Sequence, residues 1–345
     1  MLLTIVAAIF VFGLLVLVHE LGHFMTAKLT GMRVDEFAIG FGPKIFSKKY
    51  GETTYSLRAI PLGGFNDIAG MNPDDNNAGE RGYCNRPIYQ RMIVIVAGSA
   101  MNLILPIFIF FGIFLFNGVS TPSTEPILGT VVEGKAAYEA GLRSGDRVIS
   151  INGKEIATWQ NFVEIVQEAG GENLEIRYSR DGVENTANVV PVYDNSAKRA
   201  VVGVMSKANT TYPGFFESLK LAFERTGYII YAMVAALAQI IMTLSGAELA
   251  GPIGVVQMTG EVAQMGFVPL LNFAAFLSLN LGIINLLPVP ALDGGHFMML
   301  LIEAIKGSPV SPKALVYAQY VGITLLIMLM VFATKNDIVR FLAGG

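Results

Sequence analysis

Long uncharged stretches alternate with polar segments along the chain, and this pattern predicts its architecture. Four of the stretches are long enough to cross the hydrocarbon core of a bilayer as a helix, which takes about 20 apolar residues: 2–18, 92–116, 270–292 and 315–333. Only 15% of the residues are charged, against about 25% in soluble proteins. We therefore predict a polytopic α-helical membrane protein with four transmembrane helices, the first continuing to Leu29.

Between the first two apolar stretches, short segments rich in strand-forming residues predict a β-sheet. The strands expected here are 34–39, 45–49 and 53–60, and the glycine-rich segment 61–65 is expected to end the sheet. A hairpin of this composition beside a membrane can enter the bilayer and offer an edge strand to an extended peptide. An ordinary cytoplasmic hairpin is the alternative. The candidate support residues are Gly40, Gly42, Gly63 and Gly64.

The end of the first apolar stretch carries three ionisable residues, His19, Glu20 and His23. Residues four apart on a helix share a face, so the two imidazoles can bind one metal ion. In the HExxH pattern two histidines hold zinc, and the glutamate accepts a proton from the attacking water. Such a pattern also occurs by chance in helices. Ionisable groups at membrane depth are costly, however, and mark functional sites. We therefore predict a zinc site with Glu20 as catalytic base.

The third apolar stretch leads into the sequence NLLPVPALDGGH, residues 285–296. Its prolines and glycines interrupt the helix at membrane depth, where irregular backbone is tolerated only inside protein or beside a wet cavity. Catalytic zinc needs a third protein ligand, and Asp293 is the best-placed donor, with a helix cap as the alternative. His296 is expected to support the site from behind the ligands. Asn280 and Asn285 are expected to bind a substrate carbonyl or an unpaired backbone group.

The second apolar stretch contains a patch of small residues, Gly98, Ser99 and Ala100. Small residues let a neighbouring helix approach closely. Asn102 is expected to hydrogen-bond across that contact as a packing residue. A position beside the metal site is the alternative.

A further uncharged run, 226–245, is long enough to span the membrane. The side of the membrane on which the later segments must lie argues against a crossing. Lys and Arg gather in the segment 28–91, which places that loop, and the HExxH end of the first helix, on the cytoplasmic side. If 226–245 crossed, Asp293 would emerge on the opposite side from the histidines. We therefore predict that the run 226–245 lies along, or partly enters, the outer leaflet, with Glu224 and Arg225 at the surface.

From residue 127 to about 192 the composition becomes that of a small soluble domain. The segment 141–153 reads GLRSGDRVISING, and a helix over 159–169 and a hairpin turning at 180–182 are expected to follow. This pattern resembles a PDZ domain in its circularly permuted bacterial form, with a generic small β domain as the alternative. The resemblance implies a partner, because PDZ domains bind a peptide or protein tail as an added strand.

Charge and cysteine content exclude other classes. The net charge of −3, without a basic cluster, argues against nucleic acid as a partner. The single cysteine, Cys84, excludes an internal disulfide framework. A non-catalytic receptor with a structural metal is disfavoured by the glutamate between the histidines. A metal transporter is disfavoured because few other intramembrane acids are present.

Taken together, HELGH, the PDZ-like segment and NLLPVPALDGG resemble the site-2 protease family of intramembrane zinc metalloproteases, in the bacterial form that regulates sigma-E and here with one PDZ domain. The resemblance implies that His19, His23 and Asp293 bind Zn²⁺ and that Glu20 is catalytic. It also implies a membrane re-entrant β-loop and surface-lying helices within 215–245. The family's Asn-x-x-Pro-x-Pro-x-Leu-Asp-Gly pattern is matched at Asn285, Pro288, Pro290 and Asp293.

The resemblance further implies regulated intramembrane proteolysis. The substrate would be a single-span membrane protein already shortened by another protease, such as an anti-sigma factor or a remnant signal peptide, cut within its transmembrane segment. The protein would cross the bacterial cytoplasmic (inner) membrane several times, with its N-terminus and PDZ domain extracytoplasmic and its active site toward the cytoplasm. Four parts are expected: an N-terminal membrane part, the PDZ domain, membrane-surface helices and a C-terminal membrane part, at 1–118, 125–193, 212–260 and 268–345.

Overall fold

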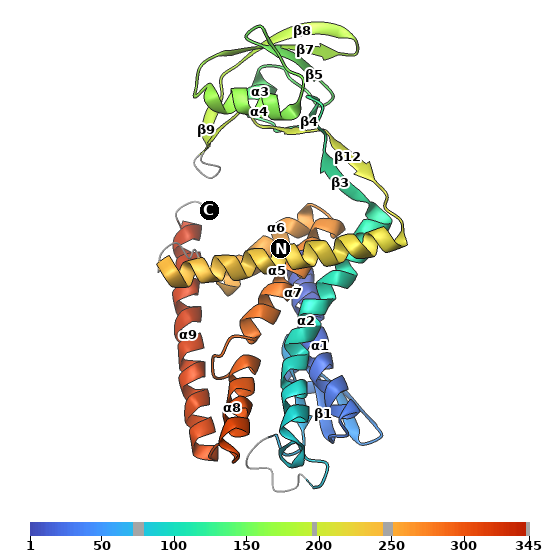
Figure 1. Ribbon diagram of the computed structural model, residues 1–345, viewed down its shortest axis with the longest axis vertical. Coiled ribbons are helices and arrows are strands. Elements are labelled where there is room, and N and C mark those ends of the chain that lie inside the picture. The colour runs from blue at the N-terminus through green and yellow to red at the C-terminus, as the bar shows by residue number, and fades with distance from the viewer. Residues whose placement is uncertain (72–78, 195–198, 244–250, 343–345) are drawn as a thin grey trace. The chain divides into compact units, whose positions relative to one another are not determined.

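The chain folds into two compact units. The segment that forms one of them is inserted into the sequence of the other. The computed structural model describes residues 1–71, 79–194, 199–243 and 251–342 (Figure 1). The helical unit comprises Met1–Ile113 and Phe215–Gly345, and the inserted unit comprises Phe114–Gly214. Residues 244 and 245, the end of the predicted surface segment, lie outside the described residues.

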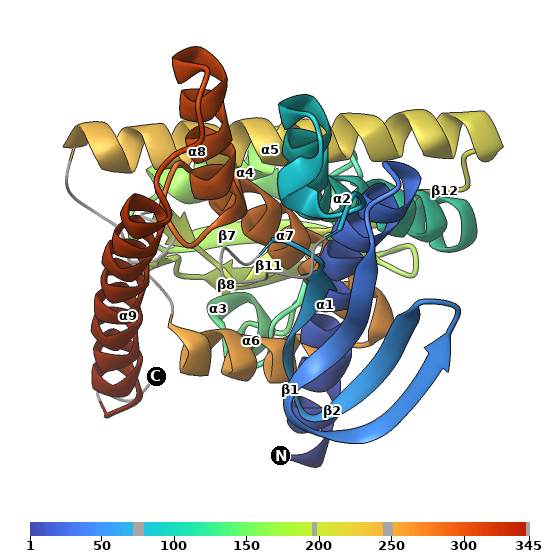
Figure 2. The same ribbon diagram turned by 90° about the horizontal axis from the view of Figure 1, so that it is seen from below.

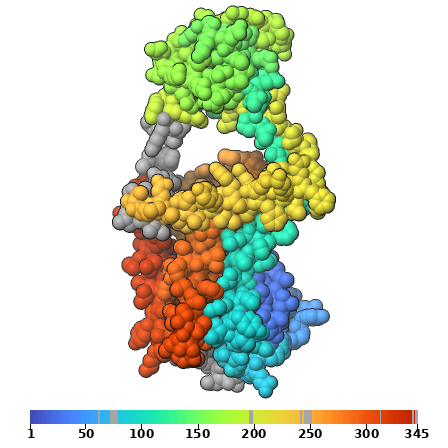
Figure 3. All heavy atoms as spheres, in the orientation of Figure 1, coloured from blue at the N-terminus to red at the C-terminus, as the bar shows by residue number. Residues whose placement is uncertain are grey.

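Seven long or medium helices build the described part of the helical unit: α1 (Leu2–Leu29), α2 (Ile88–Asn117), α5 (Phe215–Thr243), α6 (Pro252–Gln264), α7 (Phe267–Asn285), α8 (Asp293–Lys306) and α9 (Pro312–Leu342). Among the described residues, five of these helices are long and apolar enough to cross a membrane, namely α1, α2, α5, α7 and α9. Figures 1 and 2 show α5 running crosswise to α9, and Figure 3 shows its side chains as a band across the helical unit. The number of crossings therefore depends on α5, and four crossings stays a prediction.

The β-layer of the helical unit consists of β1 (Val34–Tyr50) and β2 (Thr53–Ile68), paired antiparallel. Both strands bend, so residues 34–39 pair with 54–57 on one side and with 64–68 on the other. The expectation that the sheet ends at 61–65 is wrong, since β2 continues to Ile68. The reason is backbone geometry: Gly40, Gly42 and Gly63 adopt φ of 87°, 85° and 91°, which turn the chain back into register.

Ion pairs tie the β1–β2 turn to the neighbouring elements. Glu52 accepts hydrogen bonds from Lys28 at the end of α1, at 2.6 Å, and from both terminal nitrogens of Arg81, at 2.7 and 2.9 Å. The hydrogen bonds from Arg81 and Lys28 lower the pKa of the Glu52 carboxyl to about 2. The sheet is thereby anchored beside α1 (Figure 2), which positions residues 64–68 along the helix that carries the histidines.

The inserted unit is a small α+β fold around one apolar core. Its central sheet has the strand order β6-β5-β7-β8. The predicted helix is confirmed as α4, which begins at Trp159 and is capped by the Thr158 hydroxyl, and the hairpin turns at Asp181 and Gly182 as expected. The elements are β3 (Val119–Pro122), β4 (Leu128–Val131), α3 (Ala136–Glu139), β5 (Arg147–Ile151), β6 (Lys154–Glu155), α4 (Trp159–Glu168), β7 (Leu174–Arg180), β8 (Val183–Val189), β9 (Val192–Asp194), β10 (Arg199–Val201), β11 (Val204–Ser206) and β12 (Ala208–Thr211).

Candidate metal centre

Two imidazoles meet on one face of α1. His19 and His23 are one helical turn apart, and their Nε2 atoms lie 3.2 Å from each other, with the rings edge to face. Each side chain is 13% exposed. Nδ1 of His23 lies 2.7 Å from the backbone oxygen of Val94 on α2. Since a carbonyl only accepts, Nδ1 of His23 carries the proton and its Nε2 presents a lone pair to the site.

The third donor is a carboxylate oxygen of Asp293, which lies near the C-terminal end of the sequence. Asp293 is the first residue of α8, and its Oδ2 lies 3.5 Å from Nε2 of His19 and 3.7 Å from Nε2 of His23. The turn before α8 closes tightly against the two following residues. A Cβ on Gly294 would lie 2.3 Å from the oxygen of Leu286, and a Cβ on Gly295 would lie 2.3 Å from that of Val289. The glycines therefore allow the turn that delivers the carboxylate.

Helix α2 supports all three donors from behind. Its Gly98 leaves no space for a side chain, because a Cβ there would lie 2.2 Å from Nε2 of His23. The Ser99 hydroxyl donates to Oδ2 of Asp293 at 2.7 Å. The buried Asn102 amide lies 3.2 Å from Nδ1 of His19. The structure therefore favours the alternative position for Asn102, beside the metal site.

The donor set fits a zinc ion. Zinc–ligand bonds of about 2.0–2.2 Å in a tetrahedron place ligand atoms about 3.3–3.6 Å apart. The three donor atoms are separated by 3.2, 3.5 and 3.7 Å. The oxygen of the Asn102 amide is buried and without a hydrogen-bond partner in the described chain. If the side-chain amide of Asn102 is flipped by 180°, so that its oxygen and nitrogen exchange positions, this oxygen accepts the Nδ1 proton of His19. Nε2 of His19 is then free to bind the metal.

Glu20 lies against residues 64–68 of β2, which form the outer segment of that strand. The amide nitrogen of Asn66 donates to Oε2 of Glu20 at 2.7 Å and to its backbone oxygen at 2.8 Å. Gly64 makes room for this approach, since a Cβ there would lie 2.9 Å from Cγ of Glu20. Of the glycines predicted to support the site, Gly64 therefore contacts the catalytic candidate. Gly40, Gly42 and Gly63 instead lie at bends of the sheet, near Ile60 or Phe41.

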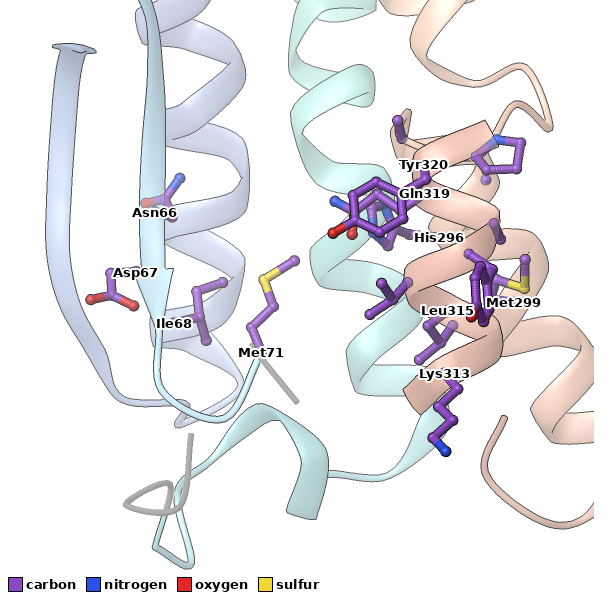
Figure 4. Close-up of a pocket in the computed structure, with 16 residues that line it drawn as sticks. Asn66, Asp67, Ile68, Met71, His296, Met299, Lys313, Leu315, Gln319 and Tyr320 are labelled. Carbon is purple, nitrogen blue, oxygen red and sulfur yellow. The ribbon is translucent and has the colours of Figure 1, made fainter. Parts of the chain in front are cut away.

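A cavity of about 880 Å³ separates the outer segment of β2 from α8 and α9 (Figure 4). Asn66, Asp67 and Ile68 line one side, and His296 of α8 lines the other. His296 lies three residues after Asp293, with Nδ1 3.3 Å from the backbone oxygen of Leu292, and is not among the three clustered donors. The cavity therefore reaches the residues next to both Glu20 and Asp293.

The remaining predicted residues are not members of the donor cluster. Asn280 is exposed on α7, Asn285 ends that helix, and Pro288 is exposed in the following turn. In the described part of the chain, neither asparagine has a hydrogen bond to the donor cluster. Pro290 lines the cavity. Ser99 and Asn66 were not predicted as site residues. The small-residue patch pointed to the backbone around Ser99, whereas nothing in the local sequence distinguished Asn66 from other polar strand residues.

Comparison with known proteins gives full-length matches. The sequence model of peptidase family M50 matches residues 7–329. Zinc metalloprotease RasP of Bacillus licheniformis is 33% identical, with 98% of this chain and 99% of the relative covered. Regulator of sigma-W protease RasP of Bacillus subtilis is 32% identical, with 98% of each covered. A putative zinc metalloprotease of Clostridium perfringens is 36% identical, with 97% and 98% covered.

Solved structures match part of the chain. The PDZ domain of an SdrC-like protein from Listeria monocytogenes aligns with 17% identity and a TM-score of 0.22, covering 25% of this chain and 90% of that domain. A protein from Geobacillus thermodenitrificans aligns with 26% identity and a TM-score of 0.21, covering 24% of this chain and 95% of that one.

Proposed function

The chain belongs to peptidase family M50 and is a site-2 type zinc metalloprotease, and we propose that it cuts a peptide bond within the transmembrane segment of a previously trimmed single-span membrane protein. The resemblance inferred from the motifs is thus confirmed at the level of the family. One observation carries the proposal: donor atoms of His19, His23 and Asp293 all lie within 4.8 Å of one another, although 270 residues separate His23 from Asp293 (293 − 23).

The roles of the residues follow from their chemistry. His19, His23 and Asp293 would hold Zn²⁺, and zinc held there supplies Lewis acidity toward the scissile carbonyl and the attacking water. Glu20 accepts the proton of that water and returns it to the leaving amine. Because three protein ligands leave one position of a tetrahedron open, this donor set suits catalysis better than a closed structural site.

The substrate would bind as a strand on the outer segment of β2. In the described chain, residues 64–68 pair with β1 along one edge, and Asn66, Asp67 and Ile68 line the cavity. An extended peptide added to the other edge would pass beside Glu20. A transmembrane helix must unwind to bind in this way, since its carbonyls are engaged in i to i−4 hydrogen bonds. The glycine-rich sheet and the cavity support this mode of binding.

The membrane arrangement extends the proposal. The exposed aromatic side chains of α5, Phe216, Phe223, Tyr228 and Tyr231, are those expected of a helix at the membrane interface. With α5 at the outer surface, the N-terminus and the inserted unit are extracytoplasmic, and the zinc site lies toward the cytoplasm. We infer that the inserted unit is the PDZ domain, which would bind a peptide or the tail of the substrate. The order of its strands and helices supports this assignment.

Glu20→Gln tests the proposed chemistry. The variant keeps the size of the side chain and the three zinc donors but cannot accept a proton. Purified protein in lipid nanodiscs should retain one zinc per chain and lose cleavage of a model single-span substrate. His23→Ala should lose both, and Glu261→Gln, an exposed substitution of the same kind on α6, should change neither. Cleavage by Glu20→Gln at a rate near that of the wild type would refute the role of Glu20.

A further inference from the structure

The Asn66 side chain directs its donors to a single residue. Its amide nitrogen carries two hydrogens, and the two acceptors within reach are Oε2 and the backbone oxygen of Glu20, at 2.7 and 2.8 Å. A glutamate on a helix surface otherwise samples several rotamers. One hydrogen bond holds the backbone oxygen of Glu20 and the other holds its carboxylate. Together they fix the position of Oε2. Oε1 has no hydrogen bond in the described residues and is therefore the freer oxygen for accepting a proton.

Packing alone does not account for an amide at this position. Oδ1 of Asn66 is buried and finds no hydrogen-bond partner in the part of the chain that the structure describes. A buried unpaired oxygen costs stability, so an apolar residue would fill the space at lower cost. The neighbouring backbone also lies close to Glu20: a Cβ on Gly64 of the same segment would lie 2.8 Å from the backbone oxygen of Ala38 and 2.9 Å from Cγ of Glu20.

We propose that Asn66 is a positioning residue that holds the Glu20 carboxylate in the orientation for proton transfer. The inference rests on the proposed role of Glu20 as base. Asn66 lies on the segment of β2 that lines the cavity (Figure 4). The strand on which the peptide would dock is therefore the strand that orients the base, and a correctly seated peptide meets a carboxylate already in place.

Steady-state cleavage separates positioning from substrate binding. Asn66→Ala should lower kcat about 10- to 100-fold, part of the 10²–10⁴ that a placed general base contributes, with KM and zinc content within twofold of wild type. Asn272→Ala is the matched control, because it removes an amide that donates to the Val268 oxygen within α7. It should leave kcat unchanged. A kcat within twofold of wild type in Asn66→Ala, or a loss explained by zinc or KM, overturns the inference.

Thermal unfolding gives a second readout that needs no catalysis. Asn66→Asp should lower the Tm by several degrees, because it sets two carboxylates against each other. In the double variant Asn66→Asp with Glu20→Gln, the new amide donates to the new carboxylate, so Asn66→Asp should lower the Tm less in the Glu20→Gln background than in the wild type. The rescue is partial, because an aspartate cannot donate to the backbone oxygen of residue 20 as Asn66 does. Additive Tm changes would show that the two side chains do not interact and would overturn the inference.

The outcomes distinguish the two proposals. If Glu20→Gln still cleaves, the role of Glu20 fails, whatever Asn66 does. If Glu20→Gln is inactive while Asn66→Ala keeps wild-type kcat, only the positioning role fails.

Discussion

The two units differ in how many of their large apolar side chains they leave exposed. In the inserted unit the large apolar residues, such as Phe162 and Ile176, are 2% and 0% exposed. In the helical unit large apolar side chains such as Phe108 and Met328 are 67% and 61% exposed, while Ser99 and Asn102 are fully buried. Lipid explains the difference, because tails replace water around the helices and apolar burial no longer drives their association. Small residues and polar contacts then hold the helices together.

This difference predicts where each unit is vulnerable. A core substitution in the inserted unit removes apolar contacts and costs stability. At the α1–α2 contact, a substitution displaces a metal donor or the residue that supports it, and lowers the amount of bound zinc. The two kinds of damage should therefore be separable within one chain.

The largest effect is expected at Gly98. Gly98→Ala would place a Cβ 2.2 Å from Nε2 of His23, so either the imidazole or α2 must move. We expect zinc content and cleavage to fall below detection by metal analysis and substrate assay. Gly112→Ala is the matched control on the same helix, since nothing lies within 4 Å of the added Cβ. Full zinc in Gly98→Ala would contradict the described contact.

A core substitution in the inserted unit should spare the metal centre. Phe162→Ala removes a buried ring and should destabilise that unit by about 3–5 kcal/mol. Hydrogen exchange followed by mass spectrometry should show faster exchange across the described parts of residues 114–214, with zinc content unchanged. Exposed Val183→Ala provides the control within the same unit. Loss of zinc from Phe162→Ala would show that damage to the core of the inserted unit also affects zinc binding in the helical unit.

The smallest effect is expected at Ser99. Ser99→Ala removes the hydrogen bond to Oδ2 of Asp293 but keeps the ligand. Losing such support typically weakens metal binding about 10- to 100-fold. Competition with a chelator should report this shift, and Ser120→Ala, an exposed hydroxyl in β3, should leave the affinity unchanged. An unaltered affinity in Ser99→Ala would mean that the hydroxyl does not orient the carboxylate.

The chemistry-bearing residues could be predicted from the sequence because their constraints are local or chemically rare. His19, Glu20 and His23 occupy adjacent positions on one helix. An aspartate after two prolines at membrane depth is rare enough to be noticed alone. The structure brings the three predicted donors together, and their assignment as zinc ligands stays a proposal for metal analysis to test.

The supporting residues could not be predicted, because they depend on pairings between distant segments. Asn66 reaches Glu20 only because three glycines fold β2 back along β1, whereas the local pattern indicated that the sheet ends before it. The sequence around Asn102 is equally compatible with a residue that packs between helices and with one that orients His19. The register between α1 and α2 decides between those roles, and a single sequence does not encode that register in any local pattern.

X-ray absorption at the zinc edge of the purified protein tests the central assignment most directly. We expect one zinc per chain, bound by two imidazole nitrogens and carboxylate or water oxygens at about 2.0–2.2 Å, without sulfur. Asp293→Ala should lose the metal or the carboxylate signal. A zinc that keeps the wild-type spectrum in Asp293→Ala, or one coordinated by sulfur, would show that Asp293 is not a ligand or that the metal binds elsewhere.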